Sequence, residues 1–198
     1  MKNKKYLIVI IGLIVLLLGG LVISKKSKGE SNNMDNVTIE MSIKNYGIIV
    51  LELDHNQAPI TVENFVNLVD NHFYDGLTFH RIIAGFMIQG GDPEGNGFGG
   101  SPNKIKGEFK SNGVNNTISH TRGVISMARS GDPNSASSQF FIMHQDYTSL
   151  DGNYAAFGHV ISGMEVVDKI ATDAKPTDNN GTIPLSQQPV IEYIKRIN

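Results

Sequence analysis

The chain has 198 residues, of which 40% are hydrophobic and 18% charged, and its formal net charge at pH 7 is −2. This composition is typical of globular proteins, and the length predicts one domain with an appended segment. The charge gives no electrostatic basis for binding nucleic acid, and the lack of cysteine excludes disulfides, thiolate metal sites, a cysteine nucleophile and a lipoprotein anchor.

The N-terminus forms a separate segment. Residues 6–23 are uncharged and almost wholly apolar. As a helix they would be about 27 Å long, close to the hydrocarbon thickness of a bilayer. Because the run is apolar on every face, we predict a transmembrane helix within residues 1–23 rather than a buried core helix.

Two interpretations of this segment stay open, a signal anchor and a signal peptide cleaved near Val22-Ile23-Ser24. The run is longer than the usual apolar region of about 7–15 residues in a signal peptide, which favours the anchor. Three lysines lie on each side of it, and the N-terminal amine tips the charge balance toward an N-terminus inside the cell. The polar residues 24–36 predict a flexible linker.

Residues 37–198 have the pattern of a mostly β domain. Ile39, Met41 and Ile43 alternate with polar side chains, which predicts a half-buried strand. Asn45-Tyr46-Gly47 is the expected turn, and residues 48–53 are the next predicted strand. A helix is predicted to begin at Ala58-Pro59 and to end within residues 71–76. Its apolar stripe, assigned to the core, consists of Val62, Phe65, Val66 and Val69.

Short apolar runs and glycine-rich turns continue to the C-terminus. Two strands are predicted within residues 77–89, followed by a loop over residues 90–110, where glycines and prolines accumulate. A short helix is expected over residues 164–170, and a surface loop of no readable function over residues 173–188. The other predicted strands are 123–128, 139–143, 155–160 and 189–197. Many short strands and two helices indicate an all-β barrel or sandwich.

Three familiar kinds of site are not supported by the sequence. The glycines of residues 95–100 have the spacing of a dinucleotide fingerprint, but they run into Ser101-Pro102 instead of opening a helix, so we interpret them as a surface loop. The six histidines are scattered without helical metal-ligand spacing, so no metal site is predicted. No serine lies in a Gly-x-Ser-x-Gly elbow, which argues against Ser-His-Asp catalysis.

Arg81 is unusual because it lies inside an otherwise apolar strand segment. A charge is costly to bury there unless it is paired or used. The residues alone leave two interpretations open: an arginine whose stem covers the core and whose head reaches a carboxylate, or a functional group.

Three blocks of sequence, in their order and spacing, resemble the cyclophilins, the cyclosporin-type peptidyl-prolyl cis/trans isomerases. The blocks are residues 79–92, residues 123–129 with 138–142, and Leu150-Asp151-Gly152 with Phe157-Gly158. The resemblance extends from about Val37 to the C-terminus. It implies an all-β fold, a closed eight-stranded antiparallel barrel capped by two short helices, and an isomerase that assists protein folding without a cofactor.

The resemblance also implies the site. Arg81 and Gln89 match catalytic positions, and the partners are proline-containing peptides and unfolded proteins. The matching substrate-binding positions are Phe86, Met87, Ala128, Arg129, Gln139, Phe141, Leu150 and Tyr154. Phe86, Met87, Phe141 and Leu150 would form the apolar pocket for the prolyl ring. Alternation along the strand predicts that Phe141 points away from its neighbour Phe140.

An arginine suits this reaction. Peptide-bond rotation has a barrier of about 18–20 kcal/mol and passes through a twisted state without amide conjugation. A fixed guanidinium can donate to the prolyl nitrogen, which becomes basic there, or hold the neighbouring carbonyl. Catalysis is then stronger binding of the twisted form, without a nucleophile.

Two positions depart from the family pattern. Ser149 lies where many cyclophilins have tryptophan, so we expect weak binding of cyclosporin, and Tyr154 lies where the family has a histidine. A different hypothesis is a binding module that kept the groove but lost turnover; the retained Arg81 and pocket residues favour the enzyme. We expect a single-pass protein of a bacterial cell membrane with its catalytic domain outside the cytoplasm, or else a protein secreted after signal-peptide cleavage.

Overall fold

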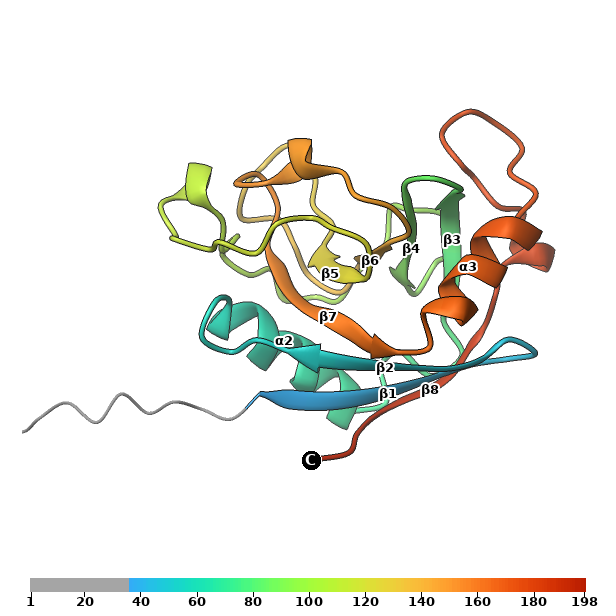
Figure 1. Ribbon diagram of the computed structural model, residues 1–198, viewed down its shortest axis with the longest axis horizontal. Helices are drawn as coiled ribbons and strands as arrows, with labels where there is room; N and C mark the ends of the chain where they lie inside the picture. The colour runs from blue at the N-terminus through green and yellow to red at the C-terminus, as the bar shows by residue number, and fades with distance from the viewer. Residues whose placement is uncertain (1–35) are drawn as a thin grey trace, which may run out of the picture. The chain divides into compact units, whose positions relative to one another are not determined.

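The structure, a computed structural model, describes residues 36–198 (Figure 1). The predicted transmembrane helix and nearly all of the predicted linker lie outside the described residues. Within residues 36–198, no helix is both long enough and apolar enough to cross a membrane.

Eight strands form one sheet in which all paired neighbours are antiparallel, with the order β3-β4-β6-β5-β7-β2-β1-β8. Each strand predicted from the sequence is present, with ends shifted by a few residues. The strands are β1 (Val37–Ile43), β2 (Gly47–Leu53), β3 (Thr78–Ile83), β4 (Met87–Asp92), β5 (Val124–Met127), β6 (Phe140–Met143), β7 (Ala156–Ser162) and β8 (Ile191–Arg196).

The sheet curls until its two edge strands approach each other (Figure 1). The start of β3 meets the residues before β8 at one isolated bridge, Thr78 to Val190. Beside this bridge, the Phe79 amide donates to the Pro189 carbonyl at 3.0 Å. The expected barrel is therefore present as a curled sheet whose edges join at a short contact and not along a full ladder.

Within residues 36–198, two α-helices accompany the sheet, α2 (Pro59–Asp70) and α3 (Met164–Asp173). Pro59 opens α2, where its fixed φ is favourable and its missing N–H is not needed. Phe65 on α2 meets Phe140 of the sheet edge-on, with ring centroids 5.6 Å apart. Both predicted helices are confirmed, and α3 extends three residues beyond the expected end because Ala171 is also buried.

Three short 3-10 helices, which the sequence did not predict, interrupt the loops. They are η1 (Lys110–Asn112), η2 (Thr148–Leu150) and η3 (Leu185–Gln187).

The strands between β3 and β7 bury apolar side chains on both faces. Phe140 is 0% exposed and belongs to the main core, which also holds the buried side chains of α2 and α3. The next residue, Phe141, belongs to a separate, smaller cluster with Met87 and Met143. The predicted opposition of Phe140 and Phe141 is confirmed, and the smaller cluster forms the base of the site described next.

Candidate active site

A shift in strand register brings Arg81 to the same face as the smaller cluster. The β3–β4 register shifts between Phe79 and Arg81, so that His80 is an extra residue in β3. As a result Phe79 and Ile82, which are three residues apart, both lie in the main core, although strict alternation would place them on opposite faces of the strand. Arg81, between His80 and Ile82, faces outward.

Cross-strand pairing then aligns four residues on this face. Arg81 on β3 pairs with Gln89 on β4, Gln89 pairs with Phe141 on β6, and Phe141 pairs with Ser126 on β5. Directly paired residues of neighbouring strands have adjacent side chains. Residues from separate blocks of the sequence are therefore neighbours in one row.

The guanidinium of Arg81 is held by oxygen atoms of uncharged groups. Nε donates to the backbone carbonyl of Asn180 at 2.7 Å, and Nη1 donates to Oε1 of Gln89 at 3.1 Å. Among residues 36–198, no carboxylate forms an ion pair with Arg81. Burial lowers the pKa of Arg81 from its ordinary value, but an arginine stays charged near neutral pH. The structure thus does not support the carboxylate-paired interpretation.

A cavity of about 230 Å³ lies beside Arg81. Nine of the ten predicted site residues line it, and the structure places no other residue in its lining. They are Arg81, Phe86, Met87, Gln89, Ala128, Arg129, Phe141, Leu150 and Tyr154.

The floor of this cavity is apolar and its rim is polar. Met87 and Phe141 are 1% and 5% exposed, so both support the floor from the smaller cluster. The Tyr154 ring meets Phe141 edge-on, with centroids 5.9 Å apart. The Arg129 guanidinium lies over the Tyr154 ring, with Cζ 4.7 Å from the ring centroid. Such a site can receive a small apolar ring and orient its backbone through the polar rim.

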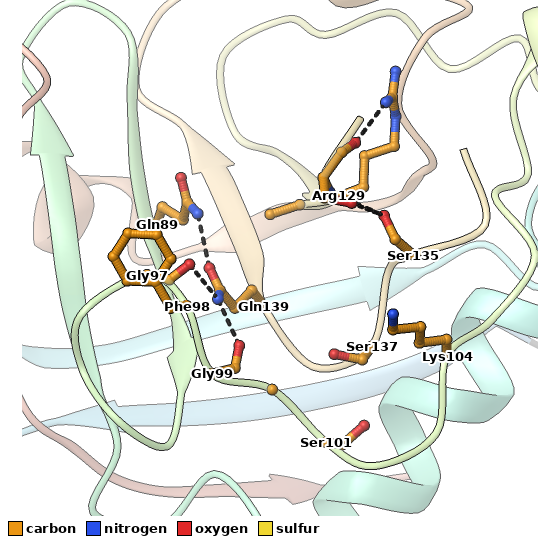
Figure 2. A pocket seen from close by; sticks show the side chains of 13 residues that line it. Gln89, Gly97, Phe98, Gly99, Ser101, Lys104, Arg129, Ser135, Ser137 and Gln139 are labelled. Carbon is orange, nitrogen blue, oxygen red and sulfur yellow. Dashed lines mark hydrogen bonds between the residues drawn. The ribbon is translucent and has the colours of Figure 1, made fainter. Parts of the chain in front are cut away.

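The tenth predicted residue, Gln139, lines a neighbouring cavity of about 400 Å³ that also includes Gln89, Ala128 and Arg129. Figure 2 shows Gln139 between Gln89 and the loop that holds Phe98. Gln89 Nε2 donates to Gln139 Oε1 at 3.0 Å, and Gln139 Nε2 donates to the carbonyls of Gly97 and Gly99 at 3.1 and 2.7 Å. One hydrogen-bonded chain therefore runs from Arg81 to the glycine-rich loop.

Comparison with known proteins gives the family. Residues 38–195 match the family model described as cyclophilin type peptidyl-prolyl cis-trans isomerase. The chain belongs to this family. A peptidyl-prolyl cis-trans isomerase of Acinetobacter baylyi is 41% identical over 194 residues, covering 93% of this chain and 96% of the relative. One from Helicobacter pylori is 47% identical over 128 residues, covering 64% of this chain and 76% of the relative.

Solved structures agree with this assignment. A crystal structure of a Cryptosporidium parvum cyclophilin-type isomerase matches with a TM-score of 0.72 and 30% identity, over 82% of this chain and 98% of that chain. A second structure, determined in the presence of the dipeptide Ala-Pro, matches with a TM-score of 0.69 and 31% identity, over 79% of this chain and 96% of that chain. The protein is a peptidyl-prolyl cis-trans isomerase.

The structure adds residues to this cyclophilin's site that the sequence did not identify. Asn180 contacts Arg81 although it lies in the segment expected to be a loop of no readable function. His120, noted only as one of six scattered histidines, stacks on Phe141 at a centroid distance of 6.0 Å. No local pattern marks either residue, because each reaches the site through a contact distant in sequence. Ser149 is exposed on η2 and does not line the cavity.

Proposed function

We propose that this cyclophilin rotates X–Pro bonds by binding the twisted amide more tightly than the planar forms. Arg81 supplies the hydrogen-bond donor, and Gln89 orients it. The prolyl ring enters the cavity formed by Phe86, Met87, Phe141 and Leu150. Ala128, Arg129, Gln139 and Tyr154 contact the peptide around the ring.

The observation that carries this mechanism is the fixed orientation of Arg81. Its Nε and Nη1 are both engaged by protein oxygens, which holds the planar guanidinium in one orientation. Among the described residues, Nη2 has no hydrogen-bond acceptor from the protein, so it is available to a ligand in the cavity. A donor placed before the reaction costs no reorganisation when charge develops on the substrate.

Proline-containing peptides are the substrates that the family assignment supports. The related C. parvum structure determined with Ala-Pro supports the same substrate class for this chain. We extend this to unfolded proteins, whose X–Pro bonds populate both isomers and interconvert slowly.

We further propose that the protein assists folding at the outer face of a bacterial cell membrane, tethered by residues 1–23. The long apolar run supports a tether, and the A. baylyi and H. pylori relatives support a bacterial setting. Fractionation of cells, with and without detergent extraction, tests the tether. Recovery of a shortened chain in the soluble secreted fraction would favour a cleaved signal peptide instead.

The catalytic proposal is tested by NMR exchange on an Ala-Pro-containing peptide with the full-length protein. We expect added enzyme to accelerate exchange between the two isomers, and Arg81→Ala to remove most of that acceleration. Binding of the peptide without acceleration by the unmodified protein would identify a binding module and contradict the proposal.

A further inference from the structure

A buried histidine lies directly behind the cavity and takes no part in the proposed chemistry. His120 is 0% exposed, and its ring stacks on Phe141 with the two planes 19° from parallel. The Tyr154 ring meets His120 edge-on, with centroids 6.5 Å apart. His120 therefore packs against two of the aromatic rings that line the cavity.

Both nitrogens of the His120 ring have partners. Nδ1 lies 2.9 Å from Oδ1 of Asp151, and Nε2 lies 3.1 Å from Oγ of Ser126. Burial lowers the pKa of His120 and outweighs the opposing effect of Asp151, so the ring is neutral at pH 7. We assign the single proton to Nδ1, beside the carboxylate, which leaves Nε2 to accept from the Ser126 hydroxyl.

These three residues have the hydrogen-bond order of a Ser-His-Asp triad, but they lack its access to substrate. Ser126 and His120 are both 0% exposed, and Ser126 lies within a strand, paired with Phe141. A nucleophile must reach the carbonyl that it attacks. The buried hydroxyl cannot do so, and the three residues therefore have a role in holding structure in place.

The element that they hold is the connection between β6 and β7, residues 144–155. Four of the nine lining residues lie on strands, whereas Leu150 and Tyr154 come from this connection, which has no ladder of its own. Asp151 Oδ1 accepts from the backbone N–H of His120 at 2.7 Å as well as from Nδ1. The His120 carbonyl accepts from the Tyr147 amide at 2.8 Å.

Other bonds also reach this connection. Before Tyr147, the Arg122 amide donates to Asp146 Oδ1 at 2.7 Å, and at Asp151 the Ser119 hydroxyl donates to Oδ2 at 2.6 Å. The Ser111 amide donates to the Gly152 carbonyl at 2.9 Å, and Arg129 Nε donates to the Asn153 carbonyl at 3.0 Å. The segment from Tyr147 to Asp151, which includes Leu150, is bonded to the rest of the protein by His120 and by the Ser119 hydroxyl.

We infer that His120 and Asp151 are positioning residues of the isomerase, which hold Leu150 and Tyr154 against Phe141 and so set the width of the prolyl-ring cavity. The inference rests on the proposed use of this cavity. Loosening the wall should weaken binding of planar and twisted peptide alike, because the ring touches it in every state. Such a change raises KM and leaves kcat nearly unaltered.

Two substitutions of similar size separate the bonds of His120. His120→Asn retains a donor near the position of Nδ1 and can still bond Asp151. His120→Gln places its amide near the position of Nε2 and loses that donor. Both remove the ring behind Phe141, so the difference between them reports the bond to Asp151.

We expect His120→Gln in the full-length protein to raise KM for a proline peptide about tenfold with kcat within about twofold, and His120→Asn to raise KM about threefold. His72→Asn is the matched control, because His72 also bonds a carboxylate, Asp75 at 3.0 Å, but its side chain is 79% exposed on the surface. We expect it to change neither constant. Equal KM values for the two His120 variants, or a fall in kcat alone, overturn the inference.

Two further measurements keep the test decisive if a His120 variant does not fold. Asp151→Ala changes a side chain that is 37% exposed, and we expect it to raise KM about tenfold at constant kcat. In the unmodified protein, ¹⁵N NMR should show a His120 ring protonated at Nδ1. An unchanged KM in Asp151→Ala, or a proton on Nε2, contradicts the inference. Arg81→Ala, measured in parallel, tests the proposed function separately because it alters kcat.

Discussion

Arg81 Nε donates to the backbone carbonyl of Asn180 at 2.7 Å, across 99 positions of sequence. The same turn also contacts β3 through an isolated bridge between Arg81 and Thr182. In this bridge the Ile82 amide donates to the Gly181 carbonyl at 2.8 Å, and the Ile183 amide donates to the His80 carbonyl at 2.9 Å. The orientation of the guanidinium is therefore set by a loop outside the sheet as well as by Gln89 within it.

Arg81→Ala should leave the protein folded and lower kcat/KM at least tenfold, a loss of roughly 1.4 kcal/mol or more of transition-state stabilisation. Arg81→Lys should recover only part of this loss, because an ammonium lacks the planar guanidinium that donates to Asn180 and Gln89 at the same time. Exchange kinetics with a proline peptide, together with a circular dichroism spectrum, provide the measurement. Near-normal turnover in folded Arg81→Ala protein would contradict the mechanism.

The turn that holds Arg81 depends on Asp178. Its carboxylate accepts from the Thr182 amide at 3.0 Å and from the Thr182 hydroxyl at 2.9 Å. Asp178→Ala should loosen the turn, release Nε of Arg81 and lower kcat about threefold with little change in KM. Asp132→Ala is a suitable control, because Asp132 also accepts a backbone amide in an exposed turn, that of Asn134 at 2.8 Å, and does not line the small cavity. Equal kinetics in both variants would show that the turn does not orient Arg81.

Phe140 and Phe141 offer a test on adjacent residues. Phe141→Leu should raise KM several-fold, because it removes apolar surface from the floor of the cavity. Phe140→Leu should lower the free energy of unfolding by about 1–2 kcal/mol and leave KM unchanged, because Phe140 lies in the main core. Urea denaturation and steady-state kinetics on both variants separate binding from stability. A similar rise in KM for both variants would mean that the cavity responds to general loosening of the sheet.

Acid should loosen the glycine-rich loop. Burial alone would raise the pKa of Asp92, but amide donors at Glu94, Asn96 and Gly97 outweigh it and hold the pKa below its ordinary value of 3.8. A carboxyl with a depressed folded-state pKa stabilises the protein above its unfolded pKa, and this stabilisation is lost as the pH falls through the folded pKa.

The loss is therefore expected below about pH 4, and Asp92→Asn should lower stability at pH 7 and flatten its acid dependence. Thermal melts across pH measure both effects. An acid limb that keeps the same slope in Asp92→Asn would assign the effect to other carboxyls.

Ser149 should limit the affinity for cyclosporin. It is exposed on η2 and offers neither the broad apolar face nor the N–H donor of a tryptophan. We expect the unmodified protein to bind cyclosporin weakly, and Ser149→Trp to bind it more tightly with little change in peptide turnover. Titration of the drug into both proteins gives the affinities. Tight binding by the unmodified protein would show that this position is not limiting.

Much of the fold could be read from local patterns. Alternation of apolar and polar residues predicted β1, the turn at Asn45-Tyr46-Gly47 placed β2 after it, and helical spacing with Pro59 predicted α2. Strand alternation also separated Phe140 from Phe141. These predictions succeed because the period of a strand or helix is a property of the neighbouring residues alone. The η helices were missed because a single turn of three residues leaves no repeating pattern.

The candidate site was predictable only where the resemblance supplied it. The three sequence blocks identified nine residues that the structure places around one cavity, yet plain core packing would have been the simplest interpretation of Phe86, Met87, Phe141 and Leu150 from the residues alone. Asn180 and His120 were missed, since their partners lie 99 and 31 positions away in the chain.

By itself, the sequence determined the order and approximate position of the strands and α-helices, the opposition of Phe140 and Phe141, and the presence of a charge in an apolar segment. Only the tertiary structure decided where that charge points. The register shift at His80 turns Arg81 away from the core, and the Asn180 carbonyl and Gln89 amide hold it there. The physical reason is that a bulge forms where one strand has an extra residue relative to its partner. Its position depends on the partner strand and not on the residues adjacent to it in the sequence.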